Sequence, residues 1–305
     1  MWGIPMFGLR TKLYNRFGLY PQIKDRDGYV ARFHHKTKPA TRYGWGRKPA
    51  NRFFERELRE RAPALRPRLE RYAALAPFFA RIARNNDGSL KPCWDNPRIP
   101  VLDCVSLCGM IEEFKPSRLV EIGSGYSTRF ICAAAEEFVP HCDITVIDPF
   151  PDHQPPAFPR RFVQQRLEDA DLSVFETLRA NDIVWMDGSH HCYSNTDVST
   201  FYLDVIPSLA PGVIVGVHDI YVPWDYPPEW EKTYCNELQV VATYLIGAGR
   251  SLEYLFPSFY ISDIDAELRA ILDPIWRLPA LSEPFTNLRG CSAFWWRTPG
   301  RGVNA

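Results

Sequence analysis

Short apolar runs that alternate with helical patterns are the feature that most constrains the fold of this 305-residue chain. The runs expected to form strands are 119–122, 143–147, 161–165, 183–186, 213–217, 252–256 and 291–296. Helices are expected at 103–114, 129–138, 172–178, 197–209, 233–246 and 266–275. Such alternation predicts a parallel sheet with helices on both faces. The expected fold class is therefore α/β, with a Rossmann-like, doubly wound, mostly parallel sheet of seven strands.

The first of these strands ends in a glycine turn, in which Glu121 is followed by Gly123 and Gly125. Glycine can take positive φ and come close to a ligand because it has no Cβ. The dinucleotide-binding fingerprint requires a third glycine where this chain has Thr128. Taken alone, the turn indicates either a nucleotide cradle or an ordinary connection between strand and helix.

Four predicted strands end in an acidic residue: Glu121, Asp148, Asp187 and Asp219. Ligands of open α/β sheets bind beyond the carboxyl ends of the strands. Clustered carboxylates repel one another unless a ligand or a cation uses them, so we expect a binding site at this edge. Asp148 lies 25 residues after Gly123, which suits an acid on the second strand that accepts hydrogen bonds from ribose hydroxyls.

Two further motifs are the most specific in the chain. One is Asp187-Gly-Ser-His190, and the other is His218-Asp219-Ile followed by Asp-Tyr-Pro-Pro-Glu-Trp230. With the acidic residue before the glycine turn, they resemble class I S-adenosylmethionine (SAM)-dependent methyltransferases. The branch they resemble is bacterial and related to macrocin O-methyltransferase and cephalosporin-hydroxylase-like proteins. The resemblance covers roughly residues 100–297 and implies the class I methyltransferase fold.

The resemblance also implies how SAM would be held. Glu121, Gly123 and Gly125 would hold its methionine end, Asp148 its ribose, and Asp169, beside Glu168, its adenine.

At the fourth and fifth strands, the resemblance implies a divalent cation, Mg²⁺ or Mn²⁺, on Asp187 and Asp219. His218 stands where relatives often have a carboxylate or an amide, and imidazole suits Mn²⁺, Fe²⁺ or Zn²⁺ better than Mg²⁺. His190 is expected either to act as a general base or to be an ordinary loop histidine. Four aromatic residues after the fifth strand fit an acceptor pocket or plain packing: Trp224, Tyr226, Trp230 and Tyr234.

The front of the chain differs from the rest. Residues 1–50 carry eleven Lys or Arg and two Asp or Glu, a net charge of +9 in a chain of net charge zero. We expect a basic, aromatic arm at 1–50, a helical extension at 51–100 and the methyltransferase domain at 101–299. The arm either contacts an anionic partner, such as a membrane surface or a phosphorylated substrate, or packs on the core or on a second subunit of a homo-oligomer. Pro63, Pro67 and Pro77 are expected to divide 51–84 into two or three short helices.

Composition narrows the cellular setting. The eight cysteines are scattered without a C-x-x-C pair, which favours reduced thiols in a cytoplasmic protein. No apolar run is long enough for a membrane span, and the first residues lack the pattern of a signal peptide. We expect no nucleic-acid partner.

The expected function is SAM-dependent O-methylation of a small-molecule or glycan hydroxyl, assisted by a divalent metal. Two alternatives remain at this point. One is a metal-dependent, hydroxylase-like enzyme on the same fold, and the other is a non-catalytic binding protein with the SAM fold.

Overall fold

The computed structural model describes residues 22–24, 30–32, 39–151, 161–282 and 290–300. The chain divides into two compact units, residues 1–40 and 41–305. In the smaller unit, strands β1 (Gln22–Lys24) and β2 (Val30–Arg32) pair antiparallel. Much of the predicted basic arm, including residues 1–21, lies outside the described residues. The predicted boundary at residue 50 falls inside the larger unit, and the division into three domains stays a prediction.

The larger unit is built on a seven-stranded sheet of order β5-β4-β3-β6-β7-β9-β8. Its strands, in chain order, are β3 (Arg118–Ile122), β4 (Asp143–Ile147), β5 (Arg161–Val163), β6 (Ile183–Met186), β7 (Ile214–Val217), β8 (Glu253–Pro257) and β9 (Phe294–Arg297). All neighbouring pairs are parallel except those of β9, which is antiparallel to both β7 and β8. The predicted mostly parallel, seven-stranded α/β fold is confirmed.

The central strands are apolar throughout because both faces of the sheet are covered. Every residue of β6 and β7 is buried, as expected for inner parallel strands. Their register places Met186 opposite Val217, so the residues that follow the two strands lie side by side. The chain order reverses between β3 and β6, and this switch point is where ligands of open α/β sheets bind.

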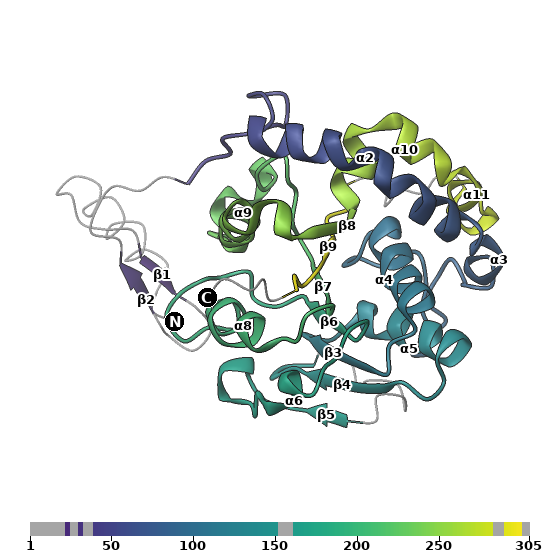
Figure 1. Ribbon diagram of the computed structural model, residues 1–305, viewed down its shortest axis with the longest axis horizontal. Helices are drawn as coiled ribbons and strands as arrows, with labels where there is room; N and C mark the ends of the chain where they lie inside the picture. The colour runs from purple at the N-terminus through teal and green to yellow at the C-terminus, as the bar shows by residue number, and fades with distance from the viewer. Residues whose placement is uncertain (1–21, 25–29, 33–38, 152–160, 283–289, 301–305) are drawn as a thin grey trace, which may run out of the picture. The chain divides into compact units, whose positions relative to one another are not determined.

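Helices pack on both faces of this sheet. Figure 1 shows α4 and α5 on one side of it and α8 and α9 on the other. The helices are α2 (Arg52–Ala73), α3 (Ala76–Phe79), α4 (Val101–Phe114), α5 (Tyr126–Phe138), α6 (Ser173–Glu176), α7 (Asp197–Thr200), α8 (Ile206–Ser208), α9 (Glu237–Ala248), α10 (Ala266–Ile271) and α11 (Asp273–Trp276). A π-helical turn, η2 (Phe201–Val205), joins α7 to α8. Among the described helices, none is long and apolar enough to cross a membrane.

The predicted breaks at Pro63 and Pro67 are wrong, because both prolines lie inside the single 22-residue helix α2. A proline inside a helix costs roughly 3 kcal/mol. The opposite side of α2 buries large apolar side chains, each contributing about 1.5–3 kcal/mol. They are Phe54, Leu58, Leu65, Leu69 and Tyr72. Burial therefore outweighs the two prolines, and the helix ends only at Ala73, before Pro77.

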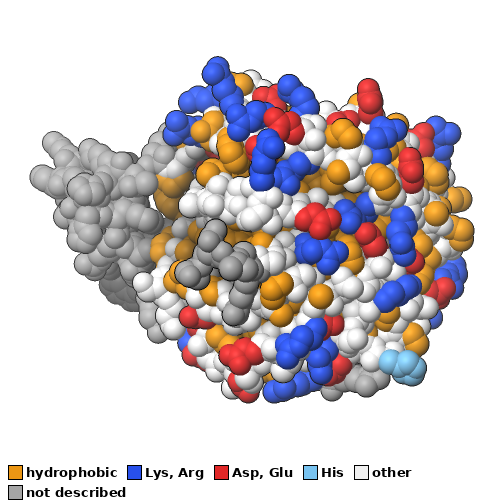
Figure 2. Space-filling view, in the orientation of Figure 1, with side chains coloured by type: hydrophobic (Ala, Val, Ile, Leu, Met, Phe, Trp, Pro, Cys, Tyr) orange, Lys and Arg blue, Asp and Glu red, His pale blue; other side chains and the backbone are white. Residues whose placement is uncertain are grey.

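α2 is also tied to the sheet domain by charged groups. Arg68 donates two hydrogen bonds to Glu113 on α4, at 2.8 and 2.9 Å, and a third to the carbonyl oxygen of Leu255 in β8. Figure 2 shows Lys and Arg gathered over α2 on the visible face, with Asp and Glu among them. The predicted helical extension is thus packed on the domain that follows it.

Some predicted boundaries differ from the structure. The helix predicted from residue 233 begins at Glu237, because a 3-10 turn, η3 (Pro228–Lys232), and a short loop precede it. The last strand begins at Phe294 instead of Cys291.

Candidate active site

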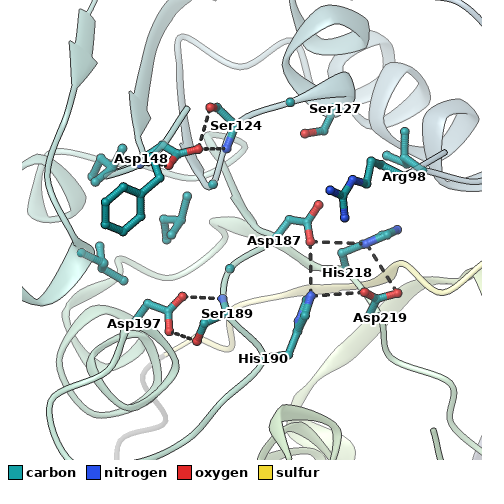
Figure 3. Close-up of a pocket in the computed structure, with 18 of the residues that line it drawn as sticks. Arg98, Ser124, Ser127, Asp148, Asp187, Ser189, His190, Asp197, His218 and Asp219 are labelled. Atoms are coloured by element: carbon teal, nitrogen blue, oxygen red, sulfur yellow. Dashed lines mark hydrogen bonds and ion pairs between the residues drawn. The ribbon is translucent and has the colours of Figure 1, made fainter. Parts of the chain in front are cut away.

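A cavity of about 1180 Å³ opens at the carboxyl edge of the sheet, beyond the ends of β3, β4, β6 and β7 (Figure 3). Loop 97–100 before α4 and turn 166–168 after β5 complete its walls. Pockets for one small ligand usually hold about 300–1,000 Å³, so this cavity has room for a cofactor together with an acceptor. Of the predicted site residues, these line it: Gly123, Gly125, Asp148, Asp187, His190, His218 and Asp219.

The glycine turn lies against the end of β6. Gly123 has a φ of +81°, and a Cβ at this position would lie 2.0 Å from the carbonyl oxygen of Asp187. A larger residue would force the two strand ends apart. Gly125 immediately precedes α5, and its N–H donates to Oγ1 of Thr128 at 3.0 Å. The turn therefore brings the backbone and the start of α5 to the cavity.

Glu121 lies beneath this turn and does not line the cavity. Its side chain is fully buried, and one oxygen accepts a hydrogen bond of 2.6 Å from the Ser127 hydroxyl. The other oxygen, Oε2, has no hydrogen-bond partner within the described structure. Burial raises the pKa of Glu121 to about 8, despite the hydrogen bond from Ser127. Ser127, which does line the cavity, therefore stands between Glu121 and the cavity.

Asp148 follows β4 and fixes the glycine turn. Its Oδ2 accepts hydrogen bonds from the backbone N–H and the hydroxyl of Ser124, at 2.7 and 2.6 Å. Its Oδ1 accepts from the backbone N–H of Phe150 at 2.7 Å. A carboxylate has about four lone-pair sites, so about one remains for a ligand in this arrangement.

Asp169 does not line the cavity, and its neighbour Glu168 does. Both belong to the 3-10 turn η1 (Leu167–Asp169), which points consecutive side chains in different directions. Asp169 is half exposed and pairs with Arg166 at 2.7 Å, whereas the Glu168 side chain is 8% exposed. Of these two acids, Glu168 and not the predicted Asp169 is therefore placed to contact a molecule in the cavity.

Asp187, His218 and Asp219 form a compact cluster. They follow the neighbouring strands β6 and β7, and one ligand atom from each lies within 4.8 Å of the others. Nδ1 of His218 is 3.4 Å from Oδ1 of Asp187 and 3.6 Å from Oδ1 of Asp219. Asp219 has a φ of +59°, a left-handed conformation that costs a non-glycine residue about 1–3 kcal/mol and concentrates at functional sites.

The ring of His218 is held by Asp103, a residue that the sequence analysis did not identify. Asp103 lies on α4, is fully buried, and accepts from the backbone N–H groups of Ser292 and Ala293 at 2.8 and 2.9 Å. Its Oδ2 is 3.2 Å from Nε2 of His218, so Nδ1 of His218 faces Asp187 and Asp219. An acid among the apolar residues of a buried helix was the signal that could have revealed it.

His190 lies on the other side of the two acids. Its Nε2 is 3.2 Å from Oδ2 of Asp219 and 3.6 Å from Oδ1 of Asp187, as Figure 3 shows. Its Nδ1 is 2.8 Å from Oε2 of Glu237, a fully buried residue at the start of α9 that the sequence analysis also did not identify. His190 has a φ of +58°, so the backbone is in the left-handed region here too.

The acids decide the ionisation of both histidines. Burial lowers the pKa of His190, but hydrogen bonds to Asp219 and Glu237 outweigh burial and raise this pKa well above its usual value. For His218, burial is likewise outweighed, here by the charges of Asp219 and Asp187. Burial works against ionisation of Asp219, yet the charge of His218 and the hydrogen bond from His190 hold the pKa of Asp219 well below its usual value. The two histidines and Asp219 therefore favour one another's charged forms.

Arg98 and Trp230 also line the cavity. Arg98 lines it from the loop before α4 and points toward Asp187 and His218 (Figure 3). Of the four aromatic residues predicted for an acceptor pocket, Trp230 lines the cavity, and Trp224, Tyr226 and Tyr234 do not. No sequence motif marked Arg98.

Residues 120–220 match the family model described as "Methyltransferase domain". An uncharacterised protein of Archaeoglobus fulgidus is 34% identical over 88 residues, which are 27% of this chain and 40% of that protein. The match thus spans less than half of the relative's length.

Solved structures with a similar fold include two methyltransferases of biosynthetic pathways. One is MycE from the mycinamycin pathway, in complex with Mg, S-adenosylhomocysteine and mycinamycin VI, at 14% identity and a TM-score of 0.37 over 64% of this chain and 49% of that chain. The other is the O-methyltransferase TomG of Streptomyces achromogenes with SAM, at 13% identity and a TM-score of 0.42 over 76% of this chain and 98% of that chain.

The matched region begins in β3, ends just after β7, and contains the glycine turn and the Asp187, His218 and Asp219 cluster. Residues 120–220 are therefore similar to the methyltransferase-domain family over the part of the chain that forms most of the cavity.

Proposed function

We propose that this chain transfers a methyl group from SAM to a hydroxyl oxygen of a small molecule or glycan, with a divalent cation at Asp187, His218 and Asp219. The observation that carries the proposal is that three potential metal ligands share one cavity with the glycine turn of the methyltransferase domain. SAM supplies an electrophilic methyl group when it is bound.

The residues around the turn fit this cofactor. The buried, unpartnered oxygen of Glu121 is an acceptor that a cationic ammonium group would satisfy through a bridging water. Asp148 and Glu168 offer acceptors farther along the same edge, where a ribose and an adenine amine need them. Gly125, where nothing lies within 4 Å of a Cβ placed on it, leaves the backbone open to close approach.

The cluster fits a divalent cation through its donor set. Two carboxylates and one imidazole nitrogen suit Mn²⁺, Fe²⁺ or Zn²⁺ better than Mg²⁺. Such a cation would act as a Lewis acid that lowers the pKa of an acceptor hydroxyl. Asp103 would orient His218 with Nδ1 toward the acids, as second ligand shells of metal sites do.

His190 is placed to accept the acceptor's proton at Nε2. Glu237 holds the opposite nitrogen, Nδ1, and so fixes the direction in which the ring presents Nε2. A proton acceptor must be neutral, whereas Asp219 and Glu237 raise the pKa of His190 and so favour its charged form. The negative charge of these two acids would therefore have to be offset before His190 could accept a proton. The reacting oxygen and the methyl group must also be held in line, and the cavity walls would orient them.

The test is a calorimetric titration of S-adenosylhomocysteine into three proteins. The unaltered chain is expected to bind it, and Asp148→Ala is expected to weaken binding at least about tenfold because it removes a ligand acceptor and releases the glycine turn. Asp169→Ala is the matched control and should bind like the unaltered chain. No heat with the unaltered chain, or unchanged affinity in Asp148→Ala, would contradict the cofactor assignment.

We extend the proposal to partners and location. Eight free cysteines suit a reducing compartment, which supports the cytoplasm. The net charge of the first fifty residues supports contact with an anionic surface, such as a membrane, or with a second copy of the chain in a homo-oligomer.

A further inference from the structure

One wall of the cavity is aromatic and comes from the loop after β7, residues 221–232. Tyr221 and Trp230 line the cavity, and the ring centroid of Trp230 lies 6.2 Å from that of His190. Tyr226 stacks on Trp230, with ring centroids 5.4 Å apart and an interplanar angle of 17°, and so supports one face of the indole. The wall therefore stands next to the histidine proposed as the proton acceptor.

A segment from far away in the sequence, residues 41–48, holds this loop by hydrogen bonds. The backbone N–H groups of Arg42 and Tyr43 donate to Oδ2 of Asp225 at 2.6 and 3.1 Å. The N–H of Thr41 and the guanidinium of Arg47 both donate to Oε1 of Glu231, each at 3.1 Å. Glu231 is the neighbour of Trp230 in the chain, so the 41–48 segment fixes the backbone that carries the indole.

The 41–48 segment is also fitted to the loop by shape. Trp45 packs its ring against Tyr221 and Trp224, with centroids 5.9 and 5.1 Å apart, and its Nε1–H donates to the carbonyl oxygen of Asp225 at 2.9 Å. Gly44 has a φ of +74°, and a Cβ there would lie 2.2 Å from Cγ of Trp224. The close approach of the 41–48 segment to the loop that carries Trp224 therefore depends on a glycine at position 44.

We propose that the 41–48 segment is an acceptor-specificity element, which holds Trp230 as the surface on which a ring of the acceptor lies. The inference rests on the proposed methyltransferase function and names its substrate class: compounds that carry the reacting hydroxyl on a flat ring or a sugar ring. A ring in contact with Trp230 brings its own hydroxyl substituents to the side of the cavity where His190, Asp187 and Asp219 meet. Aromatic faces bind such rings with defined geometry.

Two glycines in the 41–48 segment provide a matched pair of variants. Gly46 has a φ of +71°, close to that of Gly44, but nothing lies within 4 Å of a Cβ placed on it. Gly44→Ala and Gly46→Ala therefore carry similar backbone strain, and only Gly44→Ala pushes against Trp224. Trp230→Ala and the conservative Trp230→Phe test the ring itself.

The experiment uses saturation-transfer NMR to measure how tightly three probes bind to the full chain. The chain is first saturated with S-adenosylhomocysteine in a buffer that contains Mg²⁺ and no Mn²⁺. The probes are catechol, methyl mannopyranoside and ethylene glycol, which are a flat ring, a sugar ring and an open chain, each with at least one pair of neighbouring hydroxyls. We expect at least one ring probe to bind more tightly than ethylene glycol. Trp230→Ala and Gly44→Ala should weaken that binding about two- to tenfold, the size of one ring contact. Trp230→Phe and Gly46→Ala should retain it.

Calorimetric titration with S-adenosylhomocysteine tests the proposed methyltransferase function separately from the proposed role of the 41–48 segment. All four variants are expected to bind it like the unaltered chain, since none touches the glycine turn. If it binds but neither ring probe exceeds ethylene glycol, or if Gly44→Ala binds the ring probe as well as Gly46→Ala does, the specificity proposal is overturned and the methyltransferase function stands. If the unaltered chain does not bind S-adenosylhomocysteine, the proposed function itself fails.

Discussion

Glu121 is fully buried, and one of its carboxyl oxygens has no hydrogen-bond partner within the described structure. Its carboxyl group should therefore control part of the pH dependence of stability. Its pKa is raised to about 8 in the folded chain, against about 4.3 for an unperturbed Glu. The folded state thus favours the protonated form. The stabilisation is complete below about pH 4.3 and is lost as the pH rises through 8.

We predict that Glu121→Gln flattens this part of the profile. In ligand-free protein, the melting temperature of the unaltered chain should fall more steeply between about pH 5 and 8 than that of Glu121→Gln. Because other groups titrate equally in both proteins, the difference between their melting curves isolates Glu121. A constant difference across this range would mean that Glu121 is ionised in the folded state.

Elements were predictable from the sequence where periodicity and burial agree. β3, β4 and β6 lie within one residue of their predicted bounds, because apolar strands covered on both faces have one stable placement. α2 was predicted poorly, since the local effect of Pro63 and Pro67 points one way and long-range packing the other.

The same distinction applies to the site. The strand-end residues Asp187, His218 and Asp219 were expected to meet because strand order brings them together. Asp103 and Glu237 could not be paired with their histidines from the sequence, because helices 115 and 47 residues away supply them. Which of Glu168 and Asp169 faces the cavity depends on one turn of 3-10 helix, which carries no periodic signal.

At α2, we predict that proline removal stabilises the chain. Pro63 is exposed, so Pro63→Ala loses no packing and should raise the free energy of unfolding by about 1–3 kcal/mol. Ala64 is exposed as well, and Ala64→Gly should lower it by about 1 kcal/mol. Denaturant unfolding measures both. An unchanged or lower value for Pro63→Ala would show that the helix gains something from the proline.

On the scale of the whole molecule, the division after Ala40 predicts that the larger unit keeps the cofactor site by itself. A chain shortened to residues 41–305 retains the sheet, α2 and the 41–48 segment. It should bind S-adenosylhomocysteine with the affinity of the full chain, as measured by calorimetry. A clear loss of affinity would show that residues 1–40 contribute to the cofactor site.

We propose above that Asp187, His218 and Asp219 bind a divalent cation, and thermal melting after chelator treatment measures this binding. A cation at a hundredfold excess over its Kd stabilises the folded state by about 2.7 kcal/mol, or roughly 5 °C for a domain of this size. We predict such a rise with Mn²⁺ at neutral pH, its loss in Asp187→Asn and Asp219→Asn, and its retention in Glu168→Gln, which lines the cavity away from the cluster. An unchanged melting temperature in the unaltered chain, or an equal rise in Asp219→Asn, would contradict a cation at this cluster.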